Sequence, residues 1–154
     1  MNIGLTEKTR IASADILQKV LANQHILYQK MRNFHWNVKG AQFLELHTLF
    51  QVMHLDLAED IDIIAERIRS LNKKPNGTFA EIIELADLTE SSKTYATSQE
   101  MLTELLADTE KISANLRTSA KKCGEGPDSG NEDILIGQMQ KQEKNAWMLR
   151  SLLA

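Results

Sequence analysis

Two histidines and a pair of carboxylates form the most informative pattern in this sequence. The histidines are His35, within the stretch 33–40 that reads Asn-Phe-His-Trp-Asn-Val-Lys-Gly, and His47. Asp62 and Glu66 are four residues apart, so on a helix their carboxylates project from one face, one turn apart. Imidazole combined with carboxylate oxygen suits iron, zinc or manganese better than magnesium or calcium alone. The pattern therefore predicts a metal site built on helices.

The charge around these residues also favours a bound cation. No Lys or Arg lies between Lys39 and Arg67, whereas this window holds six acidic residues: Glu45, Asp56, Glu59, Asp60, Asp62 and Glu66. Carboxylates that stack without local cations repel each other unless water or a bound cation compensates. A solvated face is the default interpretation of an acidic pair at this helical spacing. The missing cations favour metal ligands instead.

Four long helices and one short helix are predicted to position these residues. Pairing of Thr or Ser with Glu three residues later predicts capping boxes at Thr78, Thr97 and Ser129. The predicted helices run from about Thr6 to Trp36, Ala41 to Leu71, Thr78 to Leu85, Thr97 to Lys122, and Ser129 to Leu153. No convincing strand is found. The fold class is therefore all-α, a four-helix bundle with a short helix in the connection between helices 2 and 3, which suits a crossover.

The second long helix carries a sustained apolar seam in steps of three and four residues. The seam consists of Phe43, Leu46, Phe50, Met53, Leu57, Ile61, Ile64, Ile68 and Leu71. His47, Gln51, Asp62 and Glu66 lie beside the seam. These four side chains can therefore face a neighbour while the seam fills the core.

Length and composition indicate one globular domain that spans residues 1–154. No segment approaches the roughly 18 uninterrupted apolar residues of a membrane helix. The first residues lack a secretory signal, and the single cysteine, Cys123, cannot form an internal disulfide. We expect a cytoplasmic location and an incidental thiol. The net charge is −3 and neither end supplies a cationic tail, so we do not expect DNA binding.

The residues resemble those of the Dps group of mini-ferritins. The resemblance rests on residues 33–40, on Phe43 with Leu46-His47, on residues 62–67 and on residues 143–151, and it covers nearly the whole chain. It implies a ferritin-like four-helix bundle that assembles into a hollow shell of twelve subunits. Such shells oxidise ferrous iron, preferably with hydrogen peroxide, and store the ferric mineral, which protects against oxidative stress.

The resemblance also implies an iron site that straddles a two-fold interface. His35 and His47 would come from one subunit, and Asp62 and Glu66 from its partner. Trp36 would lie close to the iron, where it can intercept radicals.

One position departs from the family's pattern. The family usually carries an acidic residue four positions after the second histidine, and that position is Gln51 here. A neutral amide oxygen is a poorer ligand for a hard cation than a carboxylate. The iron position built on Asp62, Glu66 and His35 is expected to survive. The second position, near His47 and Gln51, lacks its usual charge.

The remaining polar residues have simpler interpretations. His25 and His54 have no partner in the pattern and are treated as structural. Glu45, Asp56, Glu59 and Asp60 are interpreted as surface or shell-lining carboxylates. Acidic residues between positions 125 and 133 favour a helix N-terminus. By resemblance, Asp128 and Asp133 are also candidates for a three-fold pore through which ferrous iron enters.

Three functions follow from these observations. The first is a ferroxidase and iron store that uses peroxide. The second is a nucleoid protein that coats DNA, and the lack of a cationic tail argues against it. The third is a structural or metal-binding shell whose ferroxidase centre is impaired by Gln51, which only measured turnover separates from the first.

Overall fold

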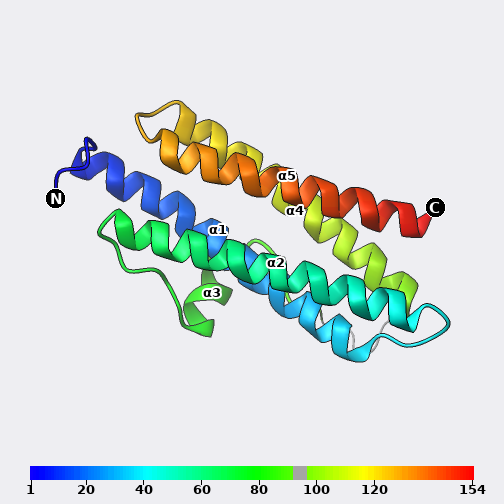
Figure 1. Ribbon diagram of the computed structural model, residues 1–154. Coiled ribbons are helices and arrows are strands. Elements are labelled where there is room, and N and C mark those ends of the chain that lie inside the picture. The colour runs from blue at the N-terminus through cyan, green and yellow to red at the C-terminus, as the bar shows by residue number, and fades with distance from the viewer. Residues whose placement is uncertain (92–96) are drawn as a thin grey trace.

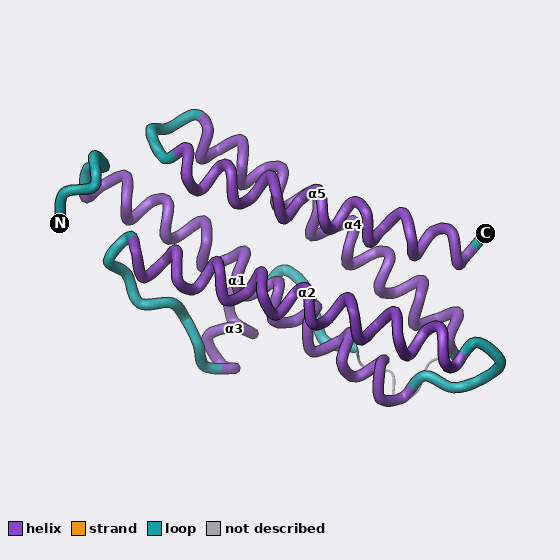
Figure 2. The backbone as a smooth tube through the Cα atoms, viewed as in Figure 1, coloured by secondary structure: helices purple, strands orange, loops and turns teal. Residues whose placement is uncertain are grey.

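The fold consists of two long helical hairpins that lie side by side (Figure 1). The structure, a computed structural model, describes residues 1–91 and 97–154. The helices are α1 (Glu7–Asn37), α2 (Phe43–Ser70), α3 (Phe79–Leu85), α4 (Ser98–Gly124) and α5 (Ser129–Leu153). α1 pairs with α2 and α4 pairs with α5, and the described residues contain no strand (Figure 2). The all-α prediction is confirmed, and the predicted helix ends agree with the observed ends to within two residues.

The chain crosses the length of the bundle between the two hairpins. α2 ends at the end of the molecule that holds the N-terminus and the α4–α5 loop, whereas α4 begins at the opposite end (Figure 1). α2 and α4 therefore run in the same direction. The short helix α3 lies in this crossing connection and packs against α1. The predicted crossover with a short helix between helices 2 and 3 is confirmed.

Side-chain caps explain where the helices begin. Thr78 and Thr97 each form the predicted capping box, with Glu81 and Glu100 respectively. The predicted cap of the last helix is wrong, because Asp128 rather than Ser129 is its N-cap. Asp128 accepts a hydrogen bond from the Asn131 backbone N–H at 3.2 Å. Asp is as good an N-cap as Ser, so the cap lies one residue earlier than predicted while the helix still begins at Ser129.

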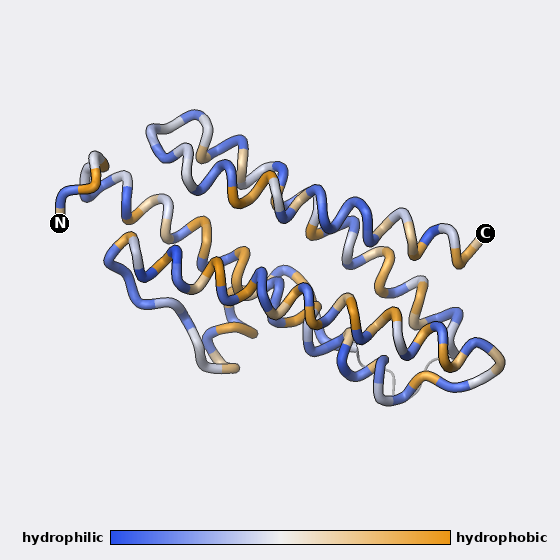
Figure 3. Tube along the Cα trace, viewed as in Figure 1, coloured by the Kyte–Doolittle hydropathy of each residue, from blue (hydrophilic) through white to orange (hydrophobic). Residues whose placement is uncertain are grey.

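The apolar seam of α2 forms one wall of the core. Its buried members are Leu46, Phe50, Met53, Leu57, Ile64, Ile68 and Leu71. Phe43 is 45% exposed, so its predicted place in the core is wrong. It lies in the first turn of α2, where its ring stacks on the His47 ring. Hydrophobic and hydrophilic residues alternate along each long helix (Figure 3). In the part of the chain that is described, no helix combines the length and apolar character needed to cross a membrane.

Two buried glutamines tie three helices together inside the core. Gln24 Nε2 of α1 donates to Gln138 Oε1 of α5 at 2.8 Å. Gln138 Nε2 donates in turn to the backbone carbonyl of Asp60 in α2 at 3.0 Å. Both glutamines are buried. Buried polar groups are tolerated only when they are hydrogen-bonded, so these contacts fix how the hairpins sit against each other.

A buried lysine holds α4 against α1. Lys30 Nζ lies 2.9 Å from Glu104 Oε1 and 2.5 Å from Asp108 Oδ2, and the lysine side chain is only 4% exposed. Removing one partner of a buried ion pair leaves uncompensated charge, which is more destabilising than losing an exposed pair.

Lys30→Ala is therefore expected to lower the free energy of unfolding by about 3 kcal/mol. The matched control is Arg117→Ala, which removes the exposed ion pair with Glu143 and should change that free energy by less than about 1 kcal/mol. Urea denaturation followed by circular dichroism measures both. Equal effects of the two substitutions would contradict a buried role for Lys30.

Candidate metal centre

The α1–α2 hairpin brings the two pattern histidines into direct contact. His35 lies in the last turn of α1, and His47 lies in the second turn of α2. Gly40, with a φ of 113°, lies in the short connection between these helices, where a positive φ favours glycine. The two imidazole rings stack with centroids 3.8 Å apart and an interplanar angle of 21°. The sequence predicted that both histidines bind a metal. The structure shows that their rings are in direct contact.

The two histidines exchange hydrogen bonds with each other's backbone. His35 Nδ1 lies 2.8 Å from the His47 carbonyl oxygen, and His47 Nδ1 lies 2.8 Å from the His35 carbonyl oxygen. A carbonyl oxygen only accepts, so each Nδ1 must carry the proton and donate. The neutral ring then keeps its lone pair on Nε2. This arrangement is the one that orients a histidine as a metal ligand through Nε2.

Aromatic rings and one cation surround the histidine pair. The His54 ring meets the His35 ring edge-on at 5.4 Å and the Tyr28 ring at 5.9 Å. Burial lowers the pKa of His54, and electrostatic repulsion between protonated His54 and its neighbours, among them the Arg32 guanidinium, lowers it further. The Arg32 guanidinium lies 4.8 Å from the Trp36 ring, and the Trp36 side chain is 57% exposed. His54 thus contributes packing against the pair, as its structural interpretation predicts.

The carboxylate pair lies far from the histidines along the same helix. Asp62 and Glu66 are exposed on the C-terminal half of α2. Fifteen residues separate His47 from Asp62, which corresponds to about 22 Å along a helix that rises 1.5 Å per residue. Metal–ligand bonds are only about 2 Å long. Among the described residues, no group of three or more His, Cys, Asp or Glu side chains is close enough to hold a metal ion.

Gln51 and Asp62 project from nearly the same side of α2. They are eleven residues apart, close to three helical turns. Leu55 lies between them and is 53% exposed, although it is a large aliphatic side chain. This side of α2 therefore combines polar ligand candidates with an exposed apolar residue near the middle of the helix.

Arg67, the first cation after Lys39, points away from the carboxylate pair. Its Nε donates to Asn131 Oδ1 and its Nη2 donates to Asp128 Oδ1, both at 2.7 Å. Asp128 is 3% exposed, whereas Asp133 is exposed in the first turns of α5. The contact ties the carboxylate end of α2 to the start of α5. Arg67 therefore forms its ion pair with Asp128.

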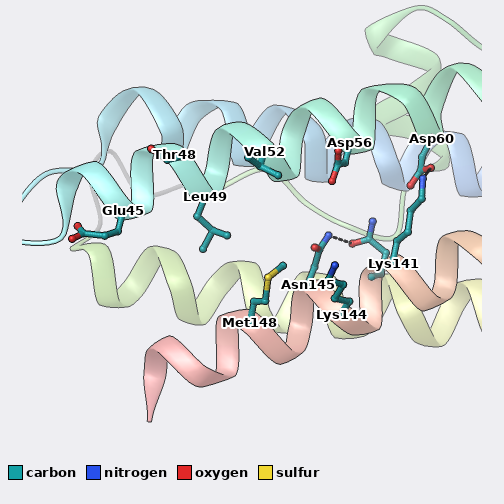
Figure 4. A pocket seen from close by; sticks show the side chains of 11 residues that line it. Glu45, Thr48, Leu49, Val52, Asp56, Asp60, Lys141, Lys144, Asn145 and Met148 are labelled. Carbon is teal, nitrogen blue, oxygen red and sulfur yellow. Dashed lines mark hydrogen bonds and ion pairs between the residues drawn. The ribbon is translucent and has the colours of Figure 1, made fainter.

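A groove of about 560 Å³ separates α2 from α5 (Figure 4). Asp56 of α2 lies opposite Lys144 and Asn145 of α5, whereas Glu45 lies at the other end of the groove, beyond Met148 (Figure 4). Asp60 lies at one end, only 1% exposed, with its Oδ1 atom 2.5 Å from Lys141 Nζ. Burial raises the pKa of the Asp60 carboxyl, against the opposing effect of Lys141.

Asp60 was predicted to be a surface or shell-lining carboxylate. The prediction of an exposed position is wrong, because the side chain is buried. Asp60 falls three residues after Leu57 and four before Ile64, which are buried members of the seam. That spacing was the signal that the sequence offered for its burial. Cys123 is also buried, and burial raises the pKa of its thiol, which agrees with an unreactive cysteine.

Comparison with known proteins identifies the class to which this fold belongs. The sequence model of the ferritin-like domain matches residues 14–154. The structure of a Dps protein from Vibrio cholerae superposes with a TM-score of 0.94 and 29% identity, over 100% of this chain and 97% of that chain. That protein is described as a member of a broad superfamily of ferritin-like diiron-carboxylate proteins.

Two curated relatives narrow the class to a family. DNA protection during starvation protein 2 of Bacillus anthracis is 35% identical over 90% of this chain and 94% of the relative. An uncharacterized low temperature-induced protein of Nostoc sp. is 38% identical over 99% of this chain and 86% of the relative. The chain belongs to the Dps family of mini-ferritins, within the ferritin-like superfamily.

The hydrogen bonds of the histidine pair predict its protonation state. In the metal-free protein above neutral pH, both His35 and His47 should carry the proton on Nδ1, because each Nδ1 faces a carbonyl oxygen. Solid-state ¹⁵N nuclear magnetic resonance of histidine-labelled protein distinguishes the two ring nitrogens. The chain has four histidines, so a His25→Gln, His54→Gln double variant leaves only the pair in the spectrum. A proton on Nε2 of either histidine would contradict this arrangement.

Proposed function

We propose that this mini-ferritin is a ferroxidase that oxidises ferrous iron with hydrogen peroxide at sites shared between two subunits. The oxidised iron is stored as ferric mineral inside a shell of twelve copies. One ferritin-like domain, residues 1–154, forms each subunit, and a cytoplasmic location fits both this role and the single unpaired cysteine. The observation that carries the proposal is the separation of the Nε2-directed histidine pair from the exposed Asp62–Glu66 pair along α2.

A two-fold axis that crosses α2 would bring the histidine pair of one subunit close to the carboxylate pair of the other. The midpoint between His47 and Asp62 falls at His54 and Leu55. If two copies of α2 run antiparallel about an axis near that point, each histidine pair meets the partner subunit's Asp62 and Glu66. Leu55, which is 53% exposed in the single chain, would then be buried near the axis. Burial of an apolar side chain stabilises such a contact.

The residues have complementary roles in the proposed reaction. Two ferrous ions lose one electron each, and the O–O bond of hydrogen peroxide breaks to give two hydroxide ions. Asp62 and Glu66 supply negative charge, which stabilises the ferric product more than the ferrous substrate. His35 and His47 supply neutral nitrogen ligands whose orientation is fixed by the Nδ1 hydrogen bonds. Trp36, exposed beside His35, is placed to intercept radicals that escape this two-electron reaction.

The two residues proposed to line the entry route for iron differ in their exposure. Asp133 is exposed near the start of α5 and is available to line a three-fold pore. Asp128 is buried, caps α5 and pairs with Arg67. We therefore assign the pore role to Asp133 and a supporting role to Asp128.

Asp62→Ala tests the proposed site directly. Even residues that only orient metal ligands change activity by about 10–100-fold when they are replaced, so loss of a ligand should slow iron oxidation by at least about tenfold. Absorbance of the ferric product measures the rate, with peroxide and then with oxygen as the oxidant. Asp56→Ala is the matched control, because Asp56 is an exposed aspartate of the same helix that faces the groove toward α5.

Light scattering on the same samples separates assembly from chemistry. The wild-type protein and both variants should form the shell at neutral pH. An Asp62→Ala shell with the wild-type oxidation rate would show that the carboxylate pair is only a solvated helix face. A wild-type monomer would rule out a site shared between subunits.

The neutral side chain of Gln51 leads to a separate prediction about the second metal position. The neutral amide leaves that position one negative charge short, so a crystal soaked in ferrous iron or zinc should show one strong metal and one weak metal per site. Gln51→Glu should raise the occupancy of the weak position and speed oxidation by peroxide, which accepts two electrons. Gln51→Leu removes the ligand without adding charge and serves as the control. Two equally occupied positions in the unmodified protein would contradict an impaired second position.

A further inference from the structure

Tyr28 lies on the same stripe of α1 as Trp36, and the side chain of Arg32 lies between their rings. The three residues are four positions apart, so they occupy one face of the helix over a length of about 12 Å. The Arg32 Cζ atom lies 5.3 Å from the centre of the Tyr28 ring and 4.8 Å from the centre of the Trp36 ring. Both distances are those of cation–π contacts. The three side chains therefore form a continuous stack that begins beside His35.

A second line of ring contacts joins Tyr28 to the histidine pair. The Tyr28 ring meets the His54 ring edge-on with centroids 5.9 Å apart, and the His54 ring meets the His35 ring in the same way at 5.4 Å. Tyr28 is therefore connected to the proposed metal centre on two sides, through Arg32 to Trp36 and through His54 to His35. The proposed two-electron reaction gives this oxidisable phenol no role.

The neutral side chain of Gln51 creates a need for an electron donor at this centre. If the second metal position fills weakly, some centres hold a single ferrous ion, which supplies only one electron. Hydrogen peroxide then splits into one hydroxide ion and one hydroxyl radical while the iron becomes ferric. The hydroxyl radical takes one electron from Trp36 and becomes hydroxide, and the indole proton converts this hydroxide into water. A neutral radical is left on Trp36, whose side chain is 57% exposed.

We infer that Tyr28 is the terminal electron donor of this centre and removes the radical from Trp36. In total, one electron and one proton pass from the phenol to the indole, so Trp36 is restored and a neutral phenoxyl radical remains on Tyr28. The inference rests on the proposed ferroxidase function for the source of the radical. The transfer between the two rings depends only on the geometry of the stack.

The charge of Arg32 and the position of Tyr28 favour this direction of transfer. A guanidinium in contact with both rings opposes a further positive charge on either of them, so a radical is stable there only in its neutral, deprotonated form. A phenol O–H releases its proton more readily than an indole N–H, which makes oxidation coupled to proton loss easier for tyrosine. Tyr28 is also less exposed than Trp36, so its radical is less accessible to other molecules.

Azide radicals generated by pulse radiolysis test the transfer in the metal-free protein. At neutral pH they oxidise indole in preference to phenol, and both tryptophans of the chain are exposed, Trp36 by 57% and Trp147 by 60%. The visible absorption of the tryptophan radical should convert into the near-ultraviolet absorption of a tyrosyl radical, at a rate independent of protein concentration. Tyr28→Phe should abolish this conversion. Tyr95→Phe, which removes the other tyrosine of the chain, is the matched control and should retain it.

A second pair of variants identifies the tryptophan that passes on its radical. Trp36→Phe should remove the conversion, whereas Trp147→Phe should leave it. All four substitutions keep an aromatic ring, and circular dichroism verifies that each variant is folded. A wild-type protein that forms no tyrosyl radical would overturn the inference. Conversion that Tyr95→Phe or Trp147→Phe abolishes, in place of the Tyr28 and Trp36 variants, would overturn it as well.

Freeze-quench electron paramagnetic resonance separates this inference from the proposed ferroxidase function. With two ferrous ions per site and hydrogen peroxide, the wild-type protein should give a tyrosyl signal that Tyr28→Phe abolishes. Gln51→Glu should weaken the signal, because paired ferrous ions reduce peroxide by two electrons. A wild-type protein that oxidises iron but forms no radical on Tyr28 would overturn the inference and leave the proposed function standing. A protein that oxidises no iron, but converts the Trp36 radical when metal-free, would support the transfer and refute the proposed function.

Discussion

The structure depends above all on one distance along α2, the distance between the two halves of the proposed ligand set. The histidine pair and the carboxylate pair are separated by about 22 Å on α2, because a helix rises 1.5 Å per residue and does not fold back. No rearrangement of side chains closes such a gap. A centre that uses both halves must borrow one of them from another copy. Metal binding and association are then thermodynamically linked, since an ion that binds only the associated form stabilises that form.

The buried side of α2 determines which residues its exposed side presents. The apolar seam, from Leu46 to Leu71, buries one side against the rest of the bundle and so fixes the rotation of the helix about its axis. The opposite side then presents Gln51, Asp62 and Glu66 at defined angles. At the start of α2, the reciprocal His35 and His47 bonds use both Nδ1 protons to close the hairpin. The same contacts that stabilise the fold therefore fix both rings and leave their Nε2 atoms available to bind a metal.

Most of the fold could be predicted from the sequence, because its determinants are local. The capping boxes at Thr78 and Thr97 and the spacing of the α2 seam depend on residues within one or two helical turns. Features that depend on tertiary contacts were harder to predict. The burial of Asp60 depends on Lys141, and the cap at Asp128 is held by Arg67, 61 residues earlier in the chain. For the site, the sequence indicated the ligand candidates, but the exchange of hydrogen bonds between His35 and His47 required the geometry of the hairpin.

The net charge of this protein does not show where its charged residues lie. A value of −3 argues against non-specific attraction to DNA. The net charge does not describe local charge, because the sum adds the cation-free stretch of α2 to the lysines and arginines of the other helices. The stretch of α2 between Lys39 and Arg67 holds six carboxylates and no Lys or Arg, so it attracts cations whatever the charge of the whole chain. A protein of modest net charge can therefore attract a metal ion where its carboxylates gather, because the interaction depends on local rather than overall electrostatics.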